Sequence, residues 1–398
     1  MLSFARHLPK ALAAATAVPI ALLGSAAASG APVSAAGHAQ HLRVRQILFG
    51  ARLTHTFRPT RSATPRTEPL TQPDDITMLD GRLFTGFQNG VGSQGEASKD
   101  GNLDSTVVEF TFSGHVVRTW DVRGKVDGLG AQRQRHRIIA TVNEDAHSSV
   151  YTITPGAAPG RRVEHYRYDI PLPHNGGTDS VSTYHGRVLI SASAPGTTGP
   201  AAPRPFYPAV FRVTFSQGRH VATVRPVFFD EAPARVANVG SAARGKTVHL
   251  ALTDPDSNEV VPRGAGRFAG DFMLSSQADK EQIYLRQNGR GVAHRHAVLR
   301  LSQAVDDTAW QSGRFGSLFA ADAAADTVDV VTGPFRPGSA FVAVTPCDGA
   351  RAPAVCPAPP SFPDNFLGSL NPWTGHIAPV RLRGPVLNPK GLVFVPRR

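Results

Sequence analysis

The sequence predicts an all-β protein and, within that class, a β-propeller. From residue 71 onward, short runs of Val, Ile, Leu, Phe and Thr alternate with Gly, Asp, Asn and Pro, and almost no stretch keeps a helical period. A first-strand pattern is anchored on Asp75 and recurs at Asp127 and Asp179, in two steps of 52 residues. Equal steps with the same strand order indicate a repeat, and four strands in such a repeat are typical of propeller blades.

The later units are less regular, and we anchor them on Asn238, Asp271 and Asp307. The chain then ends with NPKGLVFV at 388–395, a first strand that no partner strands follow. Because a propeller ring must close to protect its end strands, we expect strands at about 41–57 to complete this last unit. The sequence therefore predicts about seven four-stranded blades, closed by pairing of the N- and C-terminal strands. Six blades result if the fourth and fifth units are halves of one blade.

The chain resembles known propeller proteins in several stretches. NPKGLVFV is similar to the first-strand motif of NHL- and YVTN-type propellers. The stretches STVVEFTFSGHVVRTWDV, NEDAHSSVYTI, ALTDPDSNEVVP and DTVDVVTGPFRPGSAFVAVTPCD resemble a group of secreted actinobacterial propeller proteins of unassigned function. The likeness runs from about residue 48 to the C-terminus. It implies a propeller fold and export from the cell, and it brings no catalytic residues with it.

The N-terminal sequence predicts export independently of that resemblance. Residues 1–28 begin with basic side chains, continue with an Ala-rich apolar stretch and end with Ala26 and Ala28 in a small-x-small pattern. A membrane anchor would need a longer and more strongly apolar run. We therefore expect a cleaved signal peptide, a secreted or cell-envelope location and no transmembrane anchor. An N-terminal linker at 29–70, with the ring-closing strands, and the propeller at 71–398 then follow.

The two cysteines, Cys347 and Cys356, lie close together in a Pro-rich insertion at about 326–364. In an oxidising compartment two such thiols pair readily and restrain a short loop. No histidine stands next to either cysteine, as a metal site or a catalytic thiol would favour. We expect a disulfide between them.

The formal net charge is +12, from 42 basic and 30 acidic residues. The basic residues are mostly arginines scattered along the chain, without a basic run or the interleaving of aromatic and basic residues seen in single-strand-binding proteins. This pattern excludes a specific nucleic-acid partner and favours a solvated basic surface. We expect a monomer whose partner is an unknown protein or an acidic cell-envelope polymer.

The anchor residues of the repeat are candidates for a metal site. First strands face the central channel of a propeller, and carboxylates that converge there repel one another unless a cation binds or some are protonated. Calcium takes six to eight oxygen ligands, so we predict Ca²⁺ or another divalent cation in the channel. In the other interpretation each aspartate caps its own turn, and Asn238 and Lys390 interrupt the ring. The predicted metal ligands are Asp75, Asp127, Asp179, Asp271 and Asp307.

Two acidic loops occupy matching places in different units, NEDAH at 143–147 and LTDPDSNEV at 252–260. They could bind a cation or a cationic partner, although turns also favour such residues. Among residues that could act in catalysis, His174 precedes a channel-facing segment, and Glu144 could supply a carboxylate. The candidate ligand-binding residues of the two loops are Asp145, His147, Asp254, Asp256 and Glu259.

No complete catalytic motif is present. The sequence has no H-E-x-x-H, G-x-S-x-G or P-loop motif. We therefore predict a secreted propeller with a binding or scaffolding role in the cell envelope. The alternative is a metal-assisted hydrolase or lyase centred on the channel, as in lactonases that share the architecture.

Overall fold

Strands make up the regular structure of the computed structural model, which describes residues 42–172, 176–194, 207–287, 294–347 and 365–397. The helical segments in these ranges are short 3-10 turns such as Gly50–Arg52, so the all-β prediction is confirmed. In the same ranges no helix has the length and apolar character that a membrane span requires. The predicted signal peptide lies outside the described residues.

The first three predicted repeats each form four antiparallel strands in chain order, as the pattern of residues indicated. A parallel pair between Arg167 of β11 and Val221 of β15 joins the second and third repeats into one eight-stranded sheet. The strands are β4 (Pro73–Leu79), β5 (Arg82–Phe87), β6 (Asp104–Phe110) and β7 (Val116–Arg123); β8 (Val126–Gln132), β9 (Arg137–Val142), β10 (Ser149–Ile153) and β11 (Val163–Tyr168); and β12 (Thr178–Tyr184), β13 (Arg187–Ala192), β14 (Pro208–Ser216) and β15 (Val221–Phe229).

The segments anchored on Asn238 and Asp271 belong to one sheet, which corrects their assignment to two units. The first strand of this sheet starts at Pro255, and Asp271 only precedes its second strand. Asn238 binds the carbonyl oxygens of Arg300 and Thr374 through its amide, at 2.8 and 2.7 Å. The strands are β18 (Pro255–Val260), β19 (Phe272–Ser276), β20 (Glu281–Gln287) and β21 (His294–Arg300), with β16 (Pro233–Val236) and β17 (Thr247–His249) added beside β21.

The last two sheets exchange a hairpin, which the sequence did not predict. Strand β22 (Val305–Trp310) does not pair with the next strand in the chain but with β25 (Ala340–Val344), followed by β26 (Phe366–Leu370) and β27 (Ile377–Pro379). The intervening hairpin joins the sheet of the C-terminal strand. That sheet has the order β28 (Leu382–Arg383), β1 (Leu42–Phe49), β24 (Thr327–Thr332), β23 (Gly316–Asp322) and β29 (Pro389–Pro396).

The N- and C-terminal strands share this last sheet but do not pair directly. Strand β1 pairs with β24, and β29 pairs with β23. Strands β2 (Thr54–Phe57) and β3 (Arg66–Pro69) form a separate hairpin. The prediction that the terminal segments complete one unit is therefore correct for β1, and the direct pairing is wrong because the exchanged hairpin lies between them.

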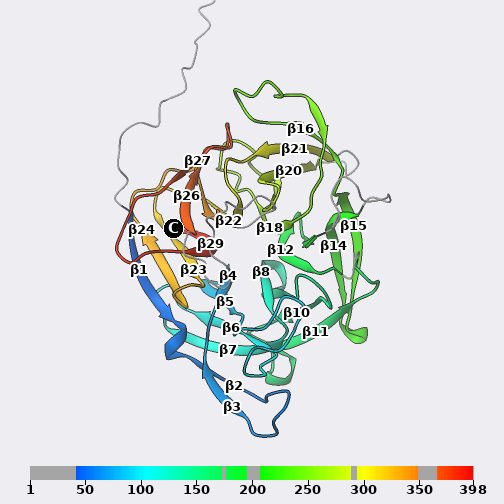
Figure 1. The fold of residues 1–398 in the computed structure, drawn as a ribbon, viewed down its shortest axis with the longest axis vertical. Helices are drawn as coiled ribbons and strands as arrows, with labels where there is room; N and C mark the ends of the chain where they lie inside the picture. The colour runs from blue at the N-terminus through cyan, green and yellow to red at the C-terminus, as the bar shows by residue number, and fades with distance from the viewer. Residues whose placement is uncertain (1–41, 173–175, 195–206, 288–293, 348–364, 398) are drawn as a thin grey trace, which may run out of the picture. The chain divides into compact units, whose positions relative to one another are not determined.

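Within the described ranges, the first strands of the sheets contact one another in a closed order. Strand β4 contacts β8, which contacts β12; the order continues through β18, β22 and β29 and returns to β4. Figure 1 shows the labels of these strands near one another, at the inner ends of their sheets. Antiparallel sheets whose first strands contact in a closed order form a β-propeller.

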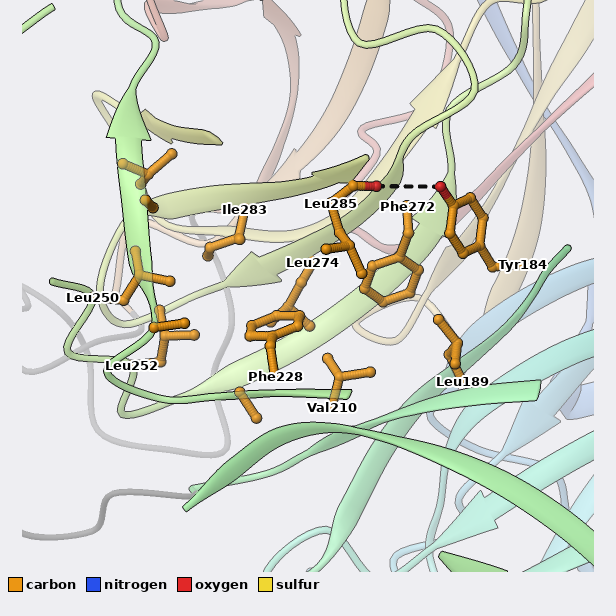
Figure 2. Packing of buried hydrophobic residues seen from close by; sticks show 14 of the residues in the cluster. Tyr184, Leu189, Val210, Phe228, Leu250, Leu252, Phe272, Leu274, Ile283 and Leu285 are labelled. Atoms are coloured by element: carbon orange, nitrogen blue, oxygen red, sulfur yellow. Dashed lines mark hydrogen bonds between the residues drawn. The ribbon is translucent and has the colours of Figure 1, made fainter. Parts of the chain in front are cut away.

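The hydrophobic core lies between neighbouring sheets. Figure 2 shows one such cluster, where Phe228 and Val210 of the third repeat lie close to Phe272 and Leu274 of the next sheet. The Tyr184 hydroxyl donates a hydrogen bond to the Leu285 carbonyl oxygen at 3.3 Å across the same boundary. Because each sheet buries apolar side chains on its neighbour, adjacent sheets stabilise one another.

Small residues allow the inner strands to approach closely. A Cβ atom on Gly128 would lie 2.6 Å from the Cα of Ser180 on the next inner strand. A Cβ on Gly391 of β29 would lie 2.8 Å from the Cα of Asp75 on β4 and would also meet the Asp74 carbonyl oxygen. The contact that closes the order of inner strands therefore depends on a residue without a side chain.

Gly391→Ala should destabilise the protein by about 1–3 kcal/mol, because the added methyl group forces β29 and β4 apart. Urea unfolding measures this loss. Gly218→Ala is the matched control, since a Cβ there meets no atom within 4 Å. Equal effects of the two substitutions would contradict a tight contact between β29 and β4.

Candidate functional site

A cavity of about 700 Å³ lies where the inner strands begin. The second residue of each inner strand lines it, because equivalent positions on neighbouring strands place their side chains alike. Five of these positions hold aspartate and one holds lysine. They are Asp74 of β4, Asp127 of β8, Asp179 of β12, Asp256 of β18, Asp306 of β22 and Lys390 of β29.

Further carboxylates complete the lining of this acidic cavity. Asp75 and Asp307 directly follow the second residues of β4 and β22. Glu144, Asp254 and Asp326 come from loops and turns. In the described part of the chain, the lining thus holds ten carboxylates against two lysines. The cavity is strongly acidic although the protein carries a formal charge of +12.

The two lysines neutralise only part of this charge. Lys390 Nζ lies 2.7 Å from Asp306 Oδ2. Lys125 Nζ lies 2.8 Å from Asp127 Oδ1 and also pairs with Glu144. Asp127 Oδ1 further accepts a hydrogen bond from the Gln88 amide at 3.2 Å. Asp127 is only 5% exposed, and its Oδ2 atom is buried without a hydrogen-bond partner.

Burial and like charges shift the pKa values of the cavity carboxylates upward. Burial raises the pKa of Asp74 to about 7, and the charge of Asp306 adds to the shift, whereas Lys390 opposes it. Burial also raises the pKa of Asp254 to about 6. The pKa of Asp127 is raised well above its ordinary value by burial and then by Glu144. These shifts show that the fully ionised set of carboxylates is unfavourable without a counter-charge.

Asp75 and Asp307 link neighbouring inner strands instead of facing the cavity freely. Asp75 Oδ1 accepts from the N–H of Ile76, and Oδ2 accepts from the N–H of Leu129 on the next inner strand, each at 2.6 Å. Asp307 makes the equivalent bonds, to its following residue at 2.7 Å and to Leu392 at 2.6 Å. Burial still raises the pKa of Asp307 to about 7. Both residues therefore accept backbone N–H groups, but each bond to the next inner strand differs from the interpretation in which every aspartate caps only its own turn.

The structure brings most of the predicted metal ligands to one cavity, with a shift in register. Asp127 and Asp179 are the second residues of their inner strands, whereas in the two Asp-Asp pairs the second residue of the strand is the first aspartate, Asp74 or Asp306. Asp271 lies outside the lining and forms an ion pair with Arg286, whose Nε is 2.7 Å from Oδ1. Asp256 of β18 takes the place that the sequence assigned to Asp271.

The remaining candidates separate into two groups. Glu144, Asp254 and Asp256 line the acidic cavity. Asp145 is exposed and hydrogen-bonds Ser93, and His147 lines a different pocket. Glu259 lines a neighbouring pocket of about 350 Å³, which shares Asp75 and Asp307 with the acidic cavity.

Two predictions lie partly or wholly outside the described residues. His174 and Cys356 are in ranges that the structure does not describe, so the catalytic role and the disulfide to Cys347 stay predictions. Within the described ranges, no three Asp, Glu, His or Cys side chains are grouped closely enough to hold one metal ion directly.

Sequence reasoning missed Asp74, Asp306, Asp326 and Lys125 as lining residues. The signal for the first two was present, because each directly follows the first residue of its strand, as Asp127 does after Val126. Nothing in the local pattern around Asp326 distinguishes it from an ordinary turn residue, and its Oδ1 accepts from the Gln72 N–H at 2.7 Å.

No protein-family model matches this chain, and no curated protein does. Similar solved structures include the periplasmic gluconolactonase PpgL of Pseudomonas aeruginosa, at 13% identity over 89% of this chain and 99% of that one, with a TM-score of 0.46. The β-propeller domain of Myceliophteria thermophila Cps50 (Swd1) is 10% identical over 83% of this chain and 100% of that one, with a TM-score of 0.37. The Malassezia sympodialis allergen Mala s 1 is 10% identical over 77% and 85%, with a TM-score of 0.40. At these scores, activity has to be argued from this chain's own residues.

The raised pKa values predict an unusual dependence of stability on pH. A carboxyl whose pKa is higher in the folded state than in the unfolded chain stabilises the fold while protonated, and this contribution is lost as pH rises through the folded-state pKa. The pKa of an aspartate in the unfolded chain is about 4, so for Asp254, at about 6, and Asp74 and Asp307, at about 7, the loss falls between about pH 4 and 7. The Tm of chelator-treated protein should therefore decrease over this range.

Asp74→Asn should reduce that decrease and raise the Tm at pH 8, because it removes one of the repelling charges. Asp80→Asn serves as the control, since Asp80 lies outside the acidic cavity and its side chain is 55% exposed. Thermal unfolding followed by circular dichroism measures both. A Tm that stays level or increases from about pH 4 to 7 would contradict the raised pKa values.

Proposed function

We propose that this chain is a secreted, six-bladed β-propeller that binds a cation, such as Ca²⁺, in its acidic cavity and acts as a binding protein of the cell envelope. One observation carries the proposal: ten carboxylates and two lysines line a single cavity, and the buried Oδ2 atom of Asp127 has no hydrogen-bond partner there. A cation supplies both the missing charge and the missing contact.

The charge balance favours a cation over a neutral ligand. A neutral molecule would displace water from the carboxylates and increase the cost of their charge. A cation instead stabilises the ionised forms of Asp74, Asp127 and Asp179, and thereby lowers their raised pKa values. The relief of repulsion between the carboxylates contributes the favourable free energy that drives binding of the cation.

Calcium suits the spread of these oxygens. It accepts irregular sets of carboxylates, carbonyl oxygens and water at 2.3–2.6 Å. Since no three side chains of the described residues already converge on one point, rotation of Asp127 and its neighbours or water molecules must complete the coordination. Magnesium fits less well, because it requires a nearly ideal octahedron at shorter distances.

The proposed number of blades rests on the inner strands. Six of them contact in closed order among the described residues, and each begins a sheet. The segments anchored on Asn238 and Asp271 fall in one sheet, which supports the alternative of six blades over the seven first expected. Export rests on the features of residues 1–28 described above.

A metal-assisted hydrolase is the second candidate, and a specific observation favours it. The pKa of Asp74 is raised to about 7, where a carboxyl can both donate and accept a proton at neutral pH. Glu144 also lines the cavity, paired with Lys125. With a cation polarising a lactone carbonyl group, the ionised Asp74 would accept a proton from the attacking water and pass it to the alkoxide that ring opening releases.

Calcium should raise the Tm of chelator-treated protein at pH 8, by several degrees at saturation. Asp127→Asn should remove most of this shift, because it removes the charge of the carboxylate whose Oδ2 atom has no hydrogen-bond partner. Asp271→Asn is the control: it lowers the starting Tm by breaking the pair with Arg286 and leaves the calcium-dependent shift intact. Isothermal titration calorimetry measures the binding directly. A calcium shift that is absent, or equal in wild type and Asp127→Asn, would refute the site.

Lactone hydrolysis assayed with calcium separates the two candidates. Turnover that is lost in Asp74→Asn while calcium still binds supports the hydrolase. Calcium binding without turnover of a panel of lactones leaves the binding protein as the function.

A further inference from the structure

Another pocket, of opposite charge, lies apart from the acidic cavity. Its volume is about 360 Å³, and it is formed by the β8–β9 connection, the start of β13 and the end of β14. No carboxylate among the described residues lines it, and it shares no lining residue with the acidic cavity. We call it the arginine pocket, because its charged lining residues are Arg135, Arg137, Arg187 and Arg212.

Arg137 gives the pocket a fixed, buried cation. The residue is 5% exposed, and its Nε donates to the Gln132 side-chain oxygen at 2.7 Å. Its guanidinium carbon lies 4.7 Å from the centre of the Phe215 ring, so the group is held between an amide and an aromatic face. Burial lowers the pKa of Arg137, but an arginine stays charged in proteins. A guanidinium has five N–H groups, more than these contacts use.

The other three arginines, Arg135, Arg187 and Arg212, are exposed around this cation. None of them forms an ion pair or a side-chain hydrogen bond with a residue that the structure describes. The carboxylate of Glu164 influences Arg137, but it does not line the pocket, and its Oε2 accepts from the Tyr166 hydroxyl at 2.6 Å and from Gln217 at 3.1 Å. Glu164 is therefore the one carboxylate of the described residues that acts on these four positive charges, and three of the four arginines have no ion pair there.

We propose that the arginine pocket binds a phosphate group of an anionic ligand. Guanidinium groups match the oxygens of phosphate with paired hydrogen bonds, and such charge-assisted bonds are among the strongest in proteins. Phosphate has more oxygens and more charge than a carboxylate, so it satisfies several guanidinium groups at once. The exposed arginines extend the positive surface beyond the buried one, which suits a ligand with neighbouring phosphates, such as a phosphate chain.

This proposal is independent of the cation site. The two pockets have no residue in common, and an experiment in the presence of chelator leaves the acidic cavity without divalent cations. Loss of phosphate binding would leave the calcium proposal standing, and the converse holds as well.

Calorimetric titration with tripolyphosphate, in chelator and at low ionic strength, tests the proposal. The Arg187→Gln/Arg212→Gln variant should bind at least about tenfold more weakly than wild type, because half of the guanidinium groups are gone. The matched control is Arg43→Gln/Arg45→Gln, which removes the same charge from exposed positions on β1 that line neither pocket. It should stay within about twofold of wild type. Circular dichroism shows whether each variant is folded.

Each other result overturns the proposal. Equal weakening in both variants would mean attraction to the general basic surface. No heat with tripolyphosphate, or equally tight binding of acetate, would exclude a phosphate site. Tighter binding of a single-stranded oligonucleotide than of tripolyphosphate, lost in the same variant, would assign the pocket to nucleic acid instead.

Discussion

Contact between successive inner strands is the constraint on which the rest of the structure depends. The inner strand of each sheet packs against the inner strand of the next sheet, and this closed order of strands is completed where β29 contacts β4. The backbones come so close that Gly128 and Gly391 have no room for a side chain. Where aspartate stands at the equivalent position instead, as at Asp75 and Asp307, its carboxylate accepts an N–H from the following inner strand. The same position therefore joins neighbouring strands by close packing or by a hydrogen bond.

The same convergence creates the electrostatic character of the cavity. A repeat that places aspartate at the second position of five of the six inner strands brings those carboxylates together once the strands meet. Lys390 occupies the sixth position and pairs with Asp306, and Lys125 enters from a loop to pair with Asp127. These two lysines reduce the repulsion between the carboxylates, but the pKa of Asp74 is still raised to about 7. Closure that stabilises the fold thus has an electrostatic cost at neutral pH, and a bound cation would offset it.

The repeat was predictable from the sequence where its hairpins are local. Asp75, Asp127 and Asp179 mark three units whose strands pair in chain order, so alternating apolar residues and turn residues suffice to find them. The exchange of β23 and β24 between sheets was not predictable, because the residues of a hairpin carry no sign of which sheet edge it joins. Asp271 was misassigned for a related reason: an aspartate before an apolar run marks a second strand as well as a first. Distinguishing Asp74 from Asp75 required the register of neighbouring strands.

The net charge of the whole protein does not indicate the local charge of its cavities. A net charge of +12 with scattered arginines indicated a basic surface; the repeat anchors predicted carboxylates in the channel, whereas no run of residues indicated the arginine pocket. Both form from residues that are far apart in the chain, such as Asp74 with Asp306, or Arg137 with Arg212. At physiological ionic strength, charges on an exposed surface are screened beyond about 8 Å, whereas charges in a recessed cavity are screened less. A cation inside the cavity therefore responds mainly to the carboxylates around it, and an anion at the arginine pocket to the guanidinium groups there. The chain carries two cavities of opposite charge because closure of the propeller gathers aspartates at the inner strands, whereas the arginines of the other pocket lie on connections and later strands.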